Sequence, residues 1–330
     1  LRPNRTDWQQ LLESLGELFV CGVTVDWRGF EQDYVRHATL LPTYPFQRQR
    51  HWLPETAQAK KRSNGALRPL IDKILQSPLL KETILETAFS TAALPFLADH
   101  KVFDEVVVPG ASHLAVVLSG AALMGMTACQ LEDVIFPSPL ILPEAQARTV
   151  QVVLSPEDSV QKARSLSFQL ISTTEATPDA ELITHATGRV VEQLTPNTPS
   201  TASLINLQAR CQEMLSPDSL YDTAAEQYIV FGPSFRWISG LWRGEGEALA
   251  ELTLPESIGS LEGYWLHPGL LDACFQAAGV TLDETASSDT LLPFMLKNMQ
   301  VFSTPKGQSW WCHVVQVGKY AWDIQLFDTS

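Results

Sequence analysis

The sequence predicts an α+β protein in which two similar units each wrap an antiparallel sheet around one buried helix. Two Pro-Gly pairs, at 109–110 and 268–269, each introduce an almost wholly apolar segment, "ASHLAVVLSGAALMG" and "LLDACFQAAG". Proline suits the first turn of a helix, and a helix that is apolar all round is buried on every side. Strand-like segments follow both helices, so the order of elements repeats.

The composition is that of an acidic globular chain. Of its 330 residues, 45% are hydrophobic and 18% are charged, and the formal net charge is -14. This charge disfavours nucleic acid or an anionic membrane surface as a partner. The five scattered cysteines lack a CxxC pair and indicate neither a disulfide framework nor a zinc site. Without an apolar run of about 18–20 residues or a signal-peptide pattern, we expect a reduced cytoplasmic protein. The start without Met suggests a piece of a longer polypeptide.

Residues 1–75 are expected to lie outside the repeated units. The segment 8–20 places its leucines on one helical face, Gly22 is expected to end that helix, and "GVTVDW" is interpreted as a short strand. "LLPTYPFQRQRHWL" (40–53) contains two prolines and suits an extended segment on another domain's surface. We therefore separate a tail, 1–53, which has too little apolar content to fold alone, from a basic, Gly- and Pro-containing linker, 54–75.

The strand candidates after the two helices differ in number. Four follow the first helix, "DVIFPSPLIL", "TVQVVLS", "SFQLIST" and "ITHATGRVV", and three follow the second, "NMQVF", "WWCHVVQV" and "AWDIQLF". The polar segment 192–203 is the natural joint, which divides the repeats into 76–196 and 197–330. The second unit is predicted to be one strand short at its C-terminus.

Three polar residues stand out in this apolar background. His100 precedes the strand-like "EVVV", and Asp272 and Gln276 share one face of the second buried helix. Burying a carboxylate is costly unless it is paired or neutralised. His100 could be a satisfied core histidine and Asp272 a polar pin bonded to Gln276. Together, an imidazole from one half and a carboxyl from the other suit general acid–base catalysis between the two units.

These residues lie in motifs that resemble the dehydratase domain of modular polyketide synthases, a double-hotdog fold, over residues 76–330. "HKVFDEVVVP" resembles the family's HxxxGxxxxP motif, although Asp104 stands where glycine is usual. "DACFQ", preceded by His267-Pro268, resembles the DxxxQ motif and its HPxLLD context. "FGP" resembles the YGP motif with Phe231 in place of tyrosine. Residues 1–53 resemble the end of an acyltransferase and the linker that follows it.

The resemblance implies dehydration of a 3-hydroxyacyl thioester, carried on the phosphopantetheine arm of an acyl carrier protein, to a 2,3-enoyl thioester, with no metal or cofactor. His100 would be the general base and Asp272 the general acid, oriented by Gln276. A backbone N–H of Gly232 or Gly110 would face the thioester oxygen, where enolate charge develops. The other residues expected at the substrate site are Pro109, Phe231, Pro233 and His267.

The resemblance also implies partners and leaves alternatives open. The expected partners are the acyl carrier protein, neighbouring synthase domains in the same polypeptide, and a second copy in a homodimer that meets through the first units. The same fold could instead catalyse enoyl isomerisation or the closure of an oxygen heterocycle (a pyran), or be a degenerate domain kept for its dimer contacts. Asp104 is expected to tolerate a turn with positive φ, with a raised pKa of His100 as the alternative. His113 is expected to pack in the core.

Overall fold

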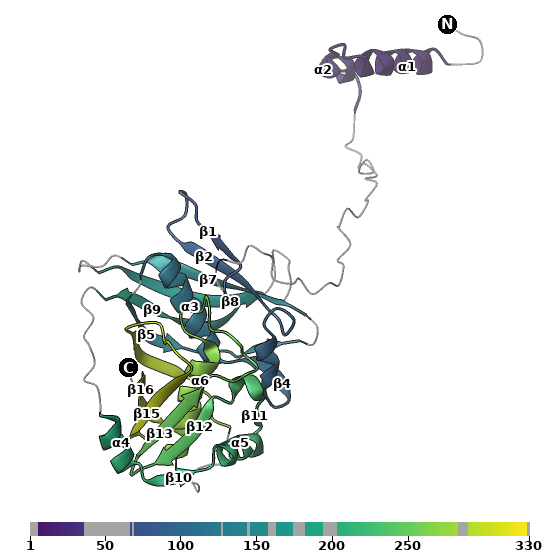
Figure 1. Ribbon diagram of the computed structural model, residues 1–330. Coiled ribbons are helices and arrows are strands. Elements are labelled where there is room, and N and C mark those ends of the chain that lie inside the picture. Colours follow the sequence, from purple (N-terminus) through teal and green to yellow (C-terminus); the bar gives the residue numbers. More distant parts are fainter. Residues whose placement is uncertain are drawn as a thin grey trace. The chain divides into compact units, whose positions relative to one another are not determined.

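The structure, a computed structural model, describes residues 6–35, 67, 69–126, 128–143, 146–157, 163–173, 182–193, 203–282 and 290–328 (Figure 1). The contacts within the chain divide it into two units, Leu1–Glu55 and Thr56–Ser330. Within the described part, none of the helices is long and apolar enough to cross a membrane. Both candidate catalytic residues belong to the unit Thr56–Ser330, which contains both predicted repeats.

The N-terminal unit contains two helices, α1 (Asp7–Val20) and α2 (Trp27–Glu31). The predicted helix and its end are confirmed, since α1 stops just before Gly22, which has a φ of 86°. The strand predicted at "GVTVDW" is wrong, because the Asp26 side chain accepts a hydrogen bond from the Gly29 amide at 3.0 Å and thereby caps α2. Neither helix buries a residue, which agrees with the low apolar content of this tail.

The linker predicted at 54–75 is partly wrong. Leu70 and Ile71 are 1% and 0% exposed, and Lys73–Leu75 form strand β1. The end of the predicted linker therefore belongs to the unit Thr56–Ser330, because its apolar side chains are buried in the hydrophobic core of that unit. Two further predictions, the extended segment at 40–53 and the joint at 192–203, lie wholly or almost wholly outside the described residues.

The first repeat packs a seven-stranded sheet against α3 (Gly110–Leu123), in which every residue from Ala111 to Ala121 is buried. The sheet is antiparallel, in the order β1-β2-β7-β8-β9-β5-β14. Its strands from the first repeat, besides β1, are β2 (Thr83–Phe89), β5 (Cys129–Ile135), β7 (Arg148–Pro156), β8 (Ser165–Thr173) and β9 (Leu182–Glu192). The buried helix and the strands predicted at "TVQVVLS", "SFQLIST" and "ITHATGRVV" are confirmed. The single strand predicted at "DVIFPSPLIL" is wrong, because this segment is interrupted at residues 136–139 and is divided between β5 and a second strand, β6 (Leu140–Leu142), in a different sheet.

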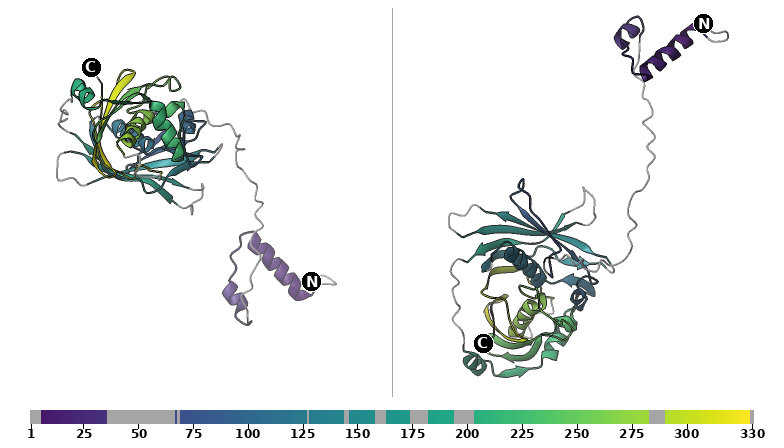
Figure 2. Two further views of the ribbon diagram at one scale, coloured as in Figure 1. Left: turned by 90° about the horizontal axis from the view of Figure 1, so that it is seen from below. Right: turned by 45° about the horizontal axis from the view of Figure 1, so that its top comes forward.

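The second repeat packs a five-stranded antiparallel sheet against α6 (Pro268–Ala278), in the order β10-β12-β13-β15-β16. These strands are β10 (Glu213–Leu215), β12 (Ile238–Arg243), β13 (Glu247–Thr253), β15 (Ser309–Gly318) and β16 (Ala321–Phe327). The other helical elements of this repeat are α4 (Leu204–Arg210), α5 (Pro217–Glu226) and the 3-10 turns η2 (Pro233–Phe235) and η3 (Gly279–Thr281). In Figure 2 the strands of both repeats surround the two buried helices, α3 and α6, which contact each other.

The second repeat contributes one strand to each of two sheets whose other strands come from the first repeat. β14 (Met295–Val301) comes from the second repeat and pairs with β5 of the first. A small sheet has the order β11-β3-β4-β6 and joins β11 (Ile229–Phe231) of the second repeat to β3 (His100–Val102) of the first. Its other strands are β4 (Glu105–Val108) and β6 (Leu140–Leu142). One hydrophobic core spans both repeats, so the two predicted units are interlocked.

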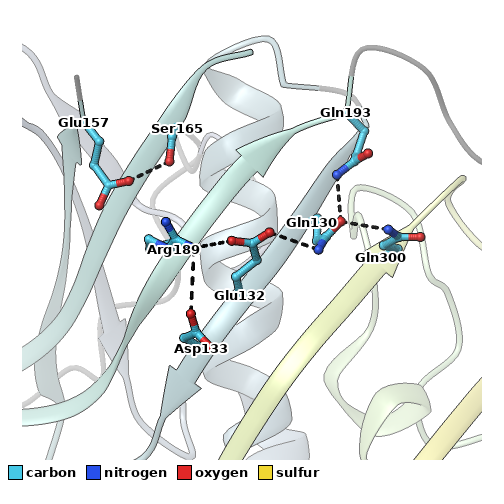
Figure 3. Close-up of polar contacts among 8 residues, drawn as sticks. All are labelled: Gln130, Glu132, Asp133, Glu157, Ser165, Arg189, Gln193 and Gln300. Carbon is cyan, nitrogen blue, oxygen red and sulfur yellow. Dashed lines mark hydrogen bonds and ion pairs between the residues drawn. The ribbon is translucent and has the colours of Figure 1, made fainter. Parts of the chain in front are cut away.

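A row of polar side chains fastens β14 to the first repeat (Figure 3). The side-chain oxygen of Gln130 on β5 accepts hydrogen bonds from Nε2 of Gln193 and from Nε2 of Gln300 on β14, each at 2.7 Å. Gln130 Nε2 donates to Glu132 at 3.1 Å, and Glu132 pairs with Arg189 on β9. The network therefore links three adjacent strands from both repeats.

Candidate active site

His100 begins β3 directly after the 3-10 turn η1 (Pro95–Asp99). It is 6% exposed, and its Nδ1 lies 2.8 Å from the carbonyl oxygen of Val107 on β4. Because a carbonyl oxygen only accepts, Nδ1 carries the proton and donates it to this bond. Nε2 is therefore the basic nitrogen of the neutral ring, and the imidazole is held in a tautomer that can accept a proton.

Aromatic rings pack around this imidazole. Phe231 is paired with His100 across β11 and β3, with ring centroids 5.5 Å apart. Phe235, from the 3-10 turn η2 (Pro233–Phe235), lies 5.2 Å from His100 between ring centroids, and Phe96 contacts Phe235 at 6.1 Å. Phe231 was predicted at the site, whereas Phe96 and Phe235 were missed, although the aromatic residue two positions after Pro233 was a usable signal.

Asp272 lies on α6, where it is 7% exposed. Its Oδ2 accepts a hydrogen bond from Gln276 Nε2 at 2.8 Å, and the same Nε2 donates to the carbonyl oxygen of Phe235 at 3.1 Å. Burial raises the pKa of the Asp272 carboxyl above its ordinary value of 3.8, and this effect outweighs the opposing influences of His100 and Gln276. The carboxyl therefore holds its proton to a higher pH than an exposed aspartate does.

The structure brings the three predicted polar residues together around η2. The Phe235 ring of this turn contacts His100, and its carbonyl oxygen accepts from Gln276, which in turn bonds Asp272. His100 is also close enough to Asp272 to act on its pKa electrostatically. The site thus combines an imidazole from the first repeat with a carboxyl from the second.

The two glycines named as possible enolate-oxygen donors differ in their hydrogen bonds. The Gly232 amide donates to the carbonyl oxygen of Asp99 at 2.7 Å, so this N–H is already engaged. Gly110 is the first residue of α3, with Pro109 as the N-cap, and amides of a first helical turn have no acceptor within the helix. A Cβ on Gly110 would lie 3.3 Å from the ring of Phe136. Of the two candidates, the geometry favours Gly110.

His267 caps α6 and packs against aromatic rings. Its Nδ1 accepts a hydrogen bond from the Gly269 amide at 3.0 Å, and its ring lies 4.6 Å from Tyr264 and 5.3 Å from Phe96 between centroids. Burial lowers the pKa of His267 to about 3, so the ring is neutral near pH 7. Pro233, the first residue of η2, is exposed.

Two secondary expectations are confirmed. Asp104 has a φ of 65°, so the residue that replaces the usual glycine adopts a left-handed turn, which aspartate tolerates better than most residues. His113 is 3% exposed on α3 beside His185 and Phe136, and burial lowers its pKa to about 3. Across the described ranges, no group of three or more His, Cys, Asp or Glu side chains is placed to hold a metal ion.

Two family models match this chain. The model described as "Polyketide synthase dehydratase domain" matches residues 68–173, and the one described as "Polyketide synthase dehydratase N-terminal domain" matches residues 199–329. The two matches correspond to the first and second repeats, and both exclude the N-terminal unit.

Solved dehydratase structures are similar over most of the chain. The dehydratase domain from the CurJ module of curacin polyketide synthase is 38% identical, covers 79% of this chain and 91% of its own, and has a TM-score of 0.72. An inactive CurJ variant with a histidine replaced by phenylalanine, in complex with a compound, has a TM-score of 0.73. An inactive CurK dehydratase variant, with an aspartate replaced by asparagine, is 25% identical, covers 80% and 92%, and has a TM-score of 0.69. The predicted double-hotdog fold is confirmed by these similarities.

The curated relatives are much longer. The pikromycin polyketide synthase component PikAII of Streptomyces venezuelae is 31% identical over 288 residues, which is 84% of this chain and 8% of that protein. Polyketide synthase GfsA of Streptomyces halstedii is 28% identical over 310 residues, 92% of this chain and 4% of that protein. The chain thus spans less than a tenth of the length of these two relatives.

Proposed function

The chain belongs to the dehydratase domains of polyketide synthases, hydro-lyases that convert a 3-hydroxyacyl thioester into a 2,3-enoyl thioester during chain extension, and from this premise we propose how its own residues carry out the elimination. His100 is the general base and Asp272 is the general acid. The observation that carries this proposal is the pairing of a buried carboxyl of raised pKa with an imidazole whose Nδ1 is fixed by Val107.

His100 Nε2 removes the proton from C2 of the substrate. Nδ1–H already donates to Val107, so the incoming proton has one place to bind and the resulting imidazolium keeps its orientation. The electron pair of the broken C2–H bond first gives an enolate and then forms the C2=C3 double bond. The unprotonated Nε2 of a neutral imidazole can act as the general base that this step requires.

Asp272 protonates the departing hydroxyl at C3. The C3–O bond breaks, its electron pair stays on oxygen, and the proton from Asp272 completes a water molecule. Gln276 Nε2 donates to Oδ2, so Oδ2 is the acceptor and Oδ1 carries the acidic proton. Gln276 therefore selects which carboxyl oxygen delivers the proton. Transfer of the proton from His100 back to Asp272 restores both groups.

Negative charge on the thioester oxygen is stabilised by the N-terminus of α3. The Gly110 amide belongs to its first turn, and the positive end of a helix dipole adds to the effect of the N–H groups. In the proposed reaction His100 takes one proton and Asp272 gives one, and the loss of water needs no oxidant or reductant, so the proposal includes no metal or cofactor.

The substrate and partners are part of the proposal. We expect the 3-hydroxyacyl chain to arrive on the phosphopantetheine arm of an acyl carrier protein, with other synthase domains in the same polypeptide and a homodimer through the first repeats. The length of the relatives supports a place within a larger chain. A cytoplasmic location also remains a prediction.

The proposal is tested with a 3-hydroxyacyl thioester of pantetheine and the 330-residue chain. Loss of one water, followed by mass spectrometry, is expected for the wild type and nearly abolished in His100→Phe and Asp272→Asn. His113→Phe removes another buried histidine, outside the proposed acid–base pair, and is expected to keep most of the activity. The proposal is wrong if folded His100→Phe and Asp272→Asn each keep most of the wild-type rate. A product with a migrated double bond or a ring would point to the alternative reactions.

A further inference from the structure

A single residue of the turn η2, Phe235, contacts the surroundings of both proposed catalytic groups. The Phe235 ring packs on His100 at 5.2 Å. The Phe235 carbonyl oxygen accepts from Gln276, which holds Asp272 Oδ2 at 2.8 Å. A displacement of this turn would therefore disturb the imidazole and the carboxyl together.

Asp99, the residue immediately before His100, holds this turn in place. Its carboxylate Oδ2 accepts a hydrogen bond from the Ser234 amide at 2.9 Å. Its carbonyl oxygen accepts from the Gly232 amide at 2.7 Å. The two bonds fix successive parts of the 232–234 segment, and a hydrogen bond to a carboxylate is stronger than one to a neutral acceptor.

The segment also fits Asp99 sterically. A Cβ at Gly232 would lie 2.5 Å from Asp99 Oδ1 and 2.6 Å from Asp99 Cγ, closer than real Cβ atoms approach such groups. Gly232 has a φ of -82°, a conformation open to any residue. Glycine at this position is therefore explained by the close approach of the Asp99 carboxylate and not by backbone conformation.

We propose that Asp99 is a positioning residue for the dehydration. Its hydrogen bonds hold the 232–235 turn in place, and this turn fixes the positions of His100 and Asp272 relative to each other. The inference rests on the proposed function of these two groups. Asp99 itself takes no part in proton transfer. Its carboxylate joins the end of η1 in the first repeat to η2 in the second, so it fixes the catalytic imidazole against the element that supports the acid.

The test compares Asp99→Ala, which removes the acceptor, with Asp99→Asn, whose side-chain oxygen can still accept from Ser234. Misplacement of reacting groups by about 1 Å costs roughly 100-fold in rate, so kcat for a 3-hydroxyacyl pantetheine thioester is expected to fall about 10- to 100-fold in Asp99→Ala. KM should stay close to the wild-type value, since Asp99 lies outside the proposed thioester contacts. Asp99→Asn should restore most of kcat. Glu105→Ala removes an exposed carboxylate from neighbouring β4 and should leave kcat unchanged.

A second readout does not depend on activity. The His100 ring lies beside two phenyl rings, so the NMR resonance of its Cε1–H reports their positions through ring currents. With 13C-labelled histidine, the signal is identified by its loss in His100→Phe. It should shift in Asp99→Ala and return in Asp99→Asn. If Asp99→Ala fails to fold, Asp99→Glu, which displaces the carboxylate by one methylene, is expected to show the same kcat loss and resonance shift.

The outcomes separate the two proposals. An unchanged kcat in Asp99→Ala, or a failure of Asp99→Asn to recover kcat and the His100 resonance, overturns the positioning role. A wild type that releases no water from the thioester overturns the proposed function instead. In that case the His100 resonance still decides whether Asp99 holds the turn, because its shift requires no substrate.

Discussion

The two repeats share a plan of strands, one buried helix and further strands, but divide the chemistry between them. Each has a buried helix introduced by Pro-Gly, yet His100 comes from a short strand before α3, whereas Asp272 comes from within α6. Neither repeat contains both groups. The proposed site therefore requires the pair of repeats, and the strand pairing of β11 with β3 places the two halves of the site next to each other.

The repeats also differ in how completely their strands are covered. In the first, β8 lies between β7 and β9 and its core-facing side chains are buried. Its counterpart in the second, β16, is the last strand of the five-stranded sheet, and Trp322, Ile324 and Leu326 on it are only partly buried. The first sheet shows what the second lacks among the described residues, a strand in the position of β9.

Combining substitutions from both repeats gives the largest expected effect. His100→Phe and Asp272→Asn should each lower kcat/KM by roughly 10²–10⁴-fold. The double variant should be little worse than the poorer single variant, because both groups act in one elimination. Steady-state kinetics of the four proteins checks this, with folding confirmed by circular dichroism. Losses that multiply would show that the two repeats contribute independently.

Opposite pH dependences should distinguish the two helices. Burial raises the folded-state pKa of Asp272 above 3.8, so its stabilising contribution is full below that value and is lost as pH rises through the raised pKa. Burial lowers the pKa of His113 from 6.5 to about 3, so its contribution is present above 6.5 and is lost as pH falls towards 3. Urea unfolding of wild type, Asp272→Asn and His113→Phe between about pH 3 and pH 6.5 measures how the free energy of unfolding of each protein changes with pH. If wild type and each variant change in parallel with pH, the two groups are not the cause.

Supplying a strand beside β16, where none of the described residues forms one, should raise the stability of the second sheet. A designed segment of about the length of β8, which has 9 residues, would follow Ser330 with alternating apolar and polar residues. Completing the burial of three side chains should contribute about 2 kcal/mol, which corresponds to a Tm increase of roughly 4–8 °C. A Gly- and Ser-rich extension of equal length serves as the control. No difference in Tm between the two extensions would mean that the second sheet needs no further strand.

The smallest effect is expected for the residue that orients the acid. Gln276→Ala removes the hydrogen bond to Asp272 Oδ2, worth about 1 kcal/mol, so kcat should fall roughly tenfold or less. Gln300→Ala removes a glutamine hydrogen bond to Gln130 at the β5–β14 junction, and is the matched control. A loss in Gln276→Ala as large as that in Asp272→Asn would assign Gln276 more than an orienting role.

The sequence was sufficient for the two buried helices, most of the strands after them and the polar residues His100, Asp272 and Gln276, because apolar periodicity and isolated polar positions are local signals. It did not separate β5 from β6 within the segment 133–142. It did not predict the pairing of β14 with β5, since alternation identifies a strand without identifying its neighbour. Asp99 and Phe235 were missed for a related reason. Their contacts depend on how the 232–235 turn approaches η1, which no spacing within either segment reveals.

The two strands that the second repeat contributes to sheets of the first, β11 and β14, limit how this domain can be recombined. A chimera that takes its first repeat from one relative and its second from another has a complete acid–base pair. Its β5–β14 and β3–β11 strand pairs, however, each combine strands from two different proteins. Side chains such as Gln130 and Gln300, which meet across the β5–β14 pair at 2.7 Å, have to change together. The two repeats are therefore best exchanged together. A recombination point outside the domain keeps the β5–β14 and β3–β11 pairings, whereas one between the repeats disrupts them.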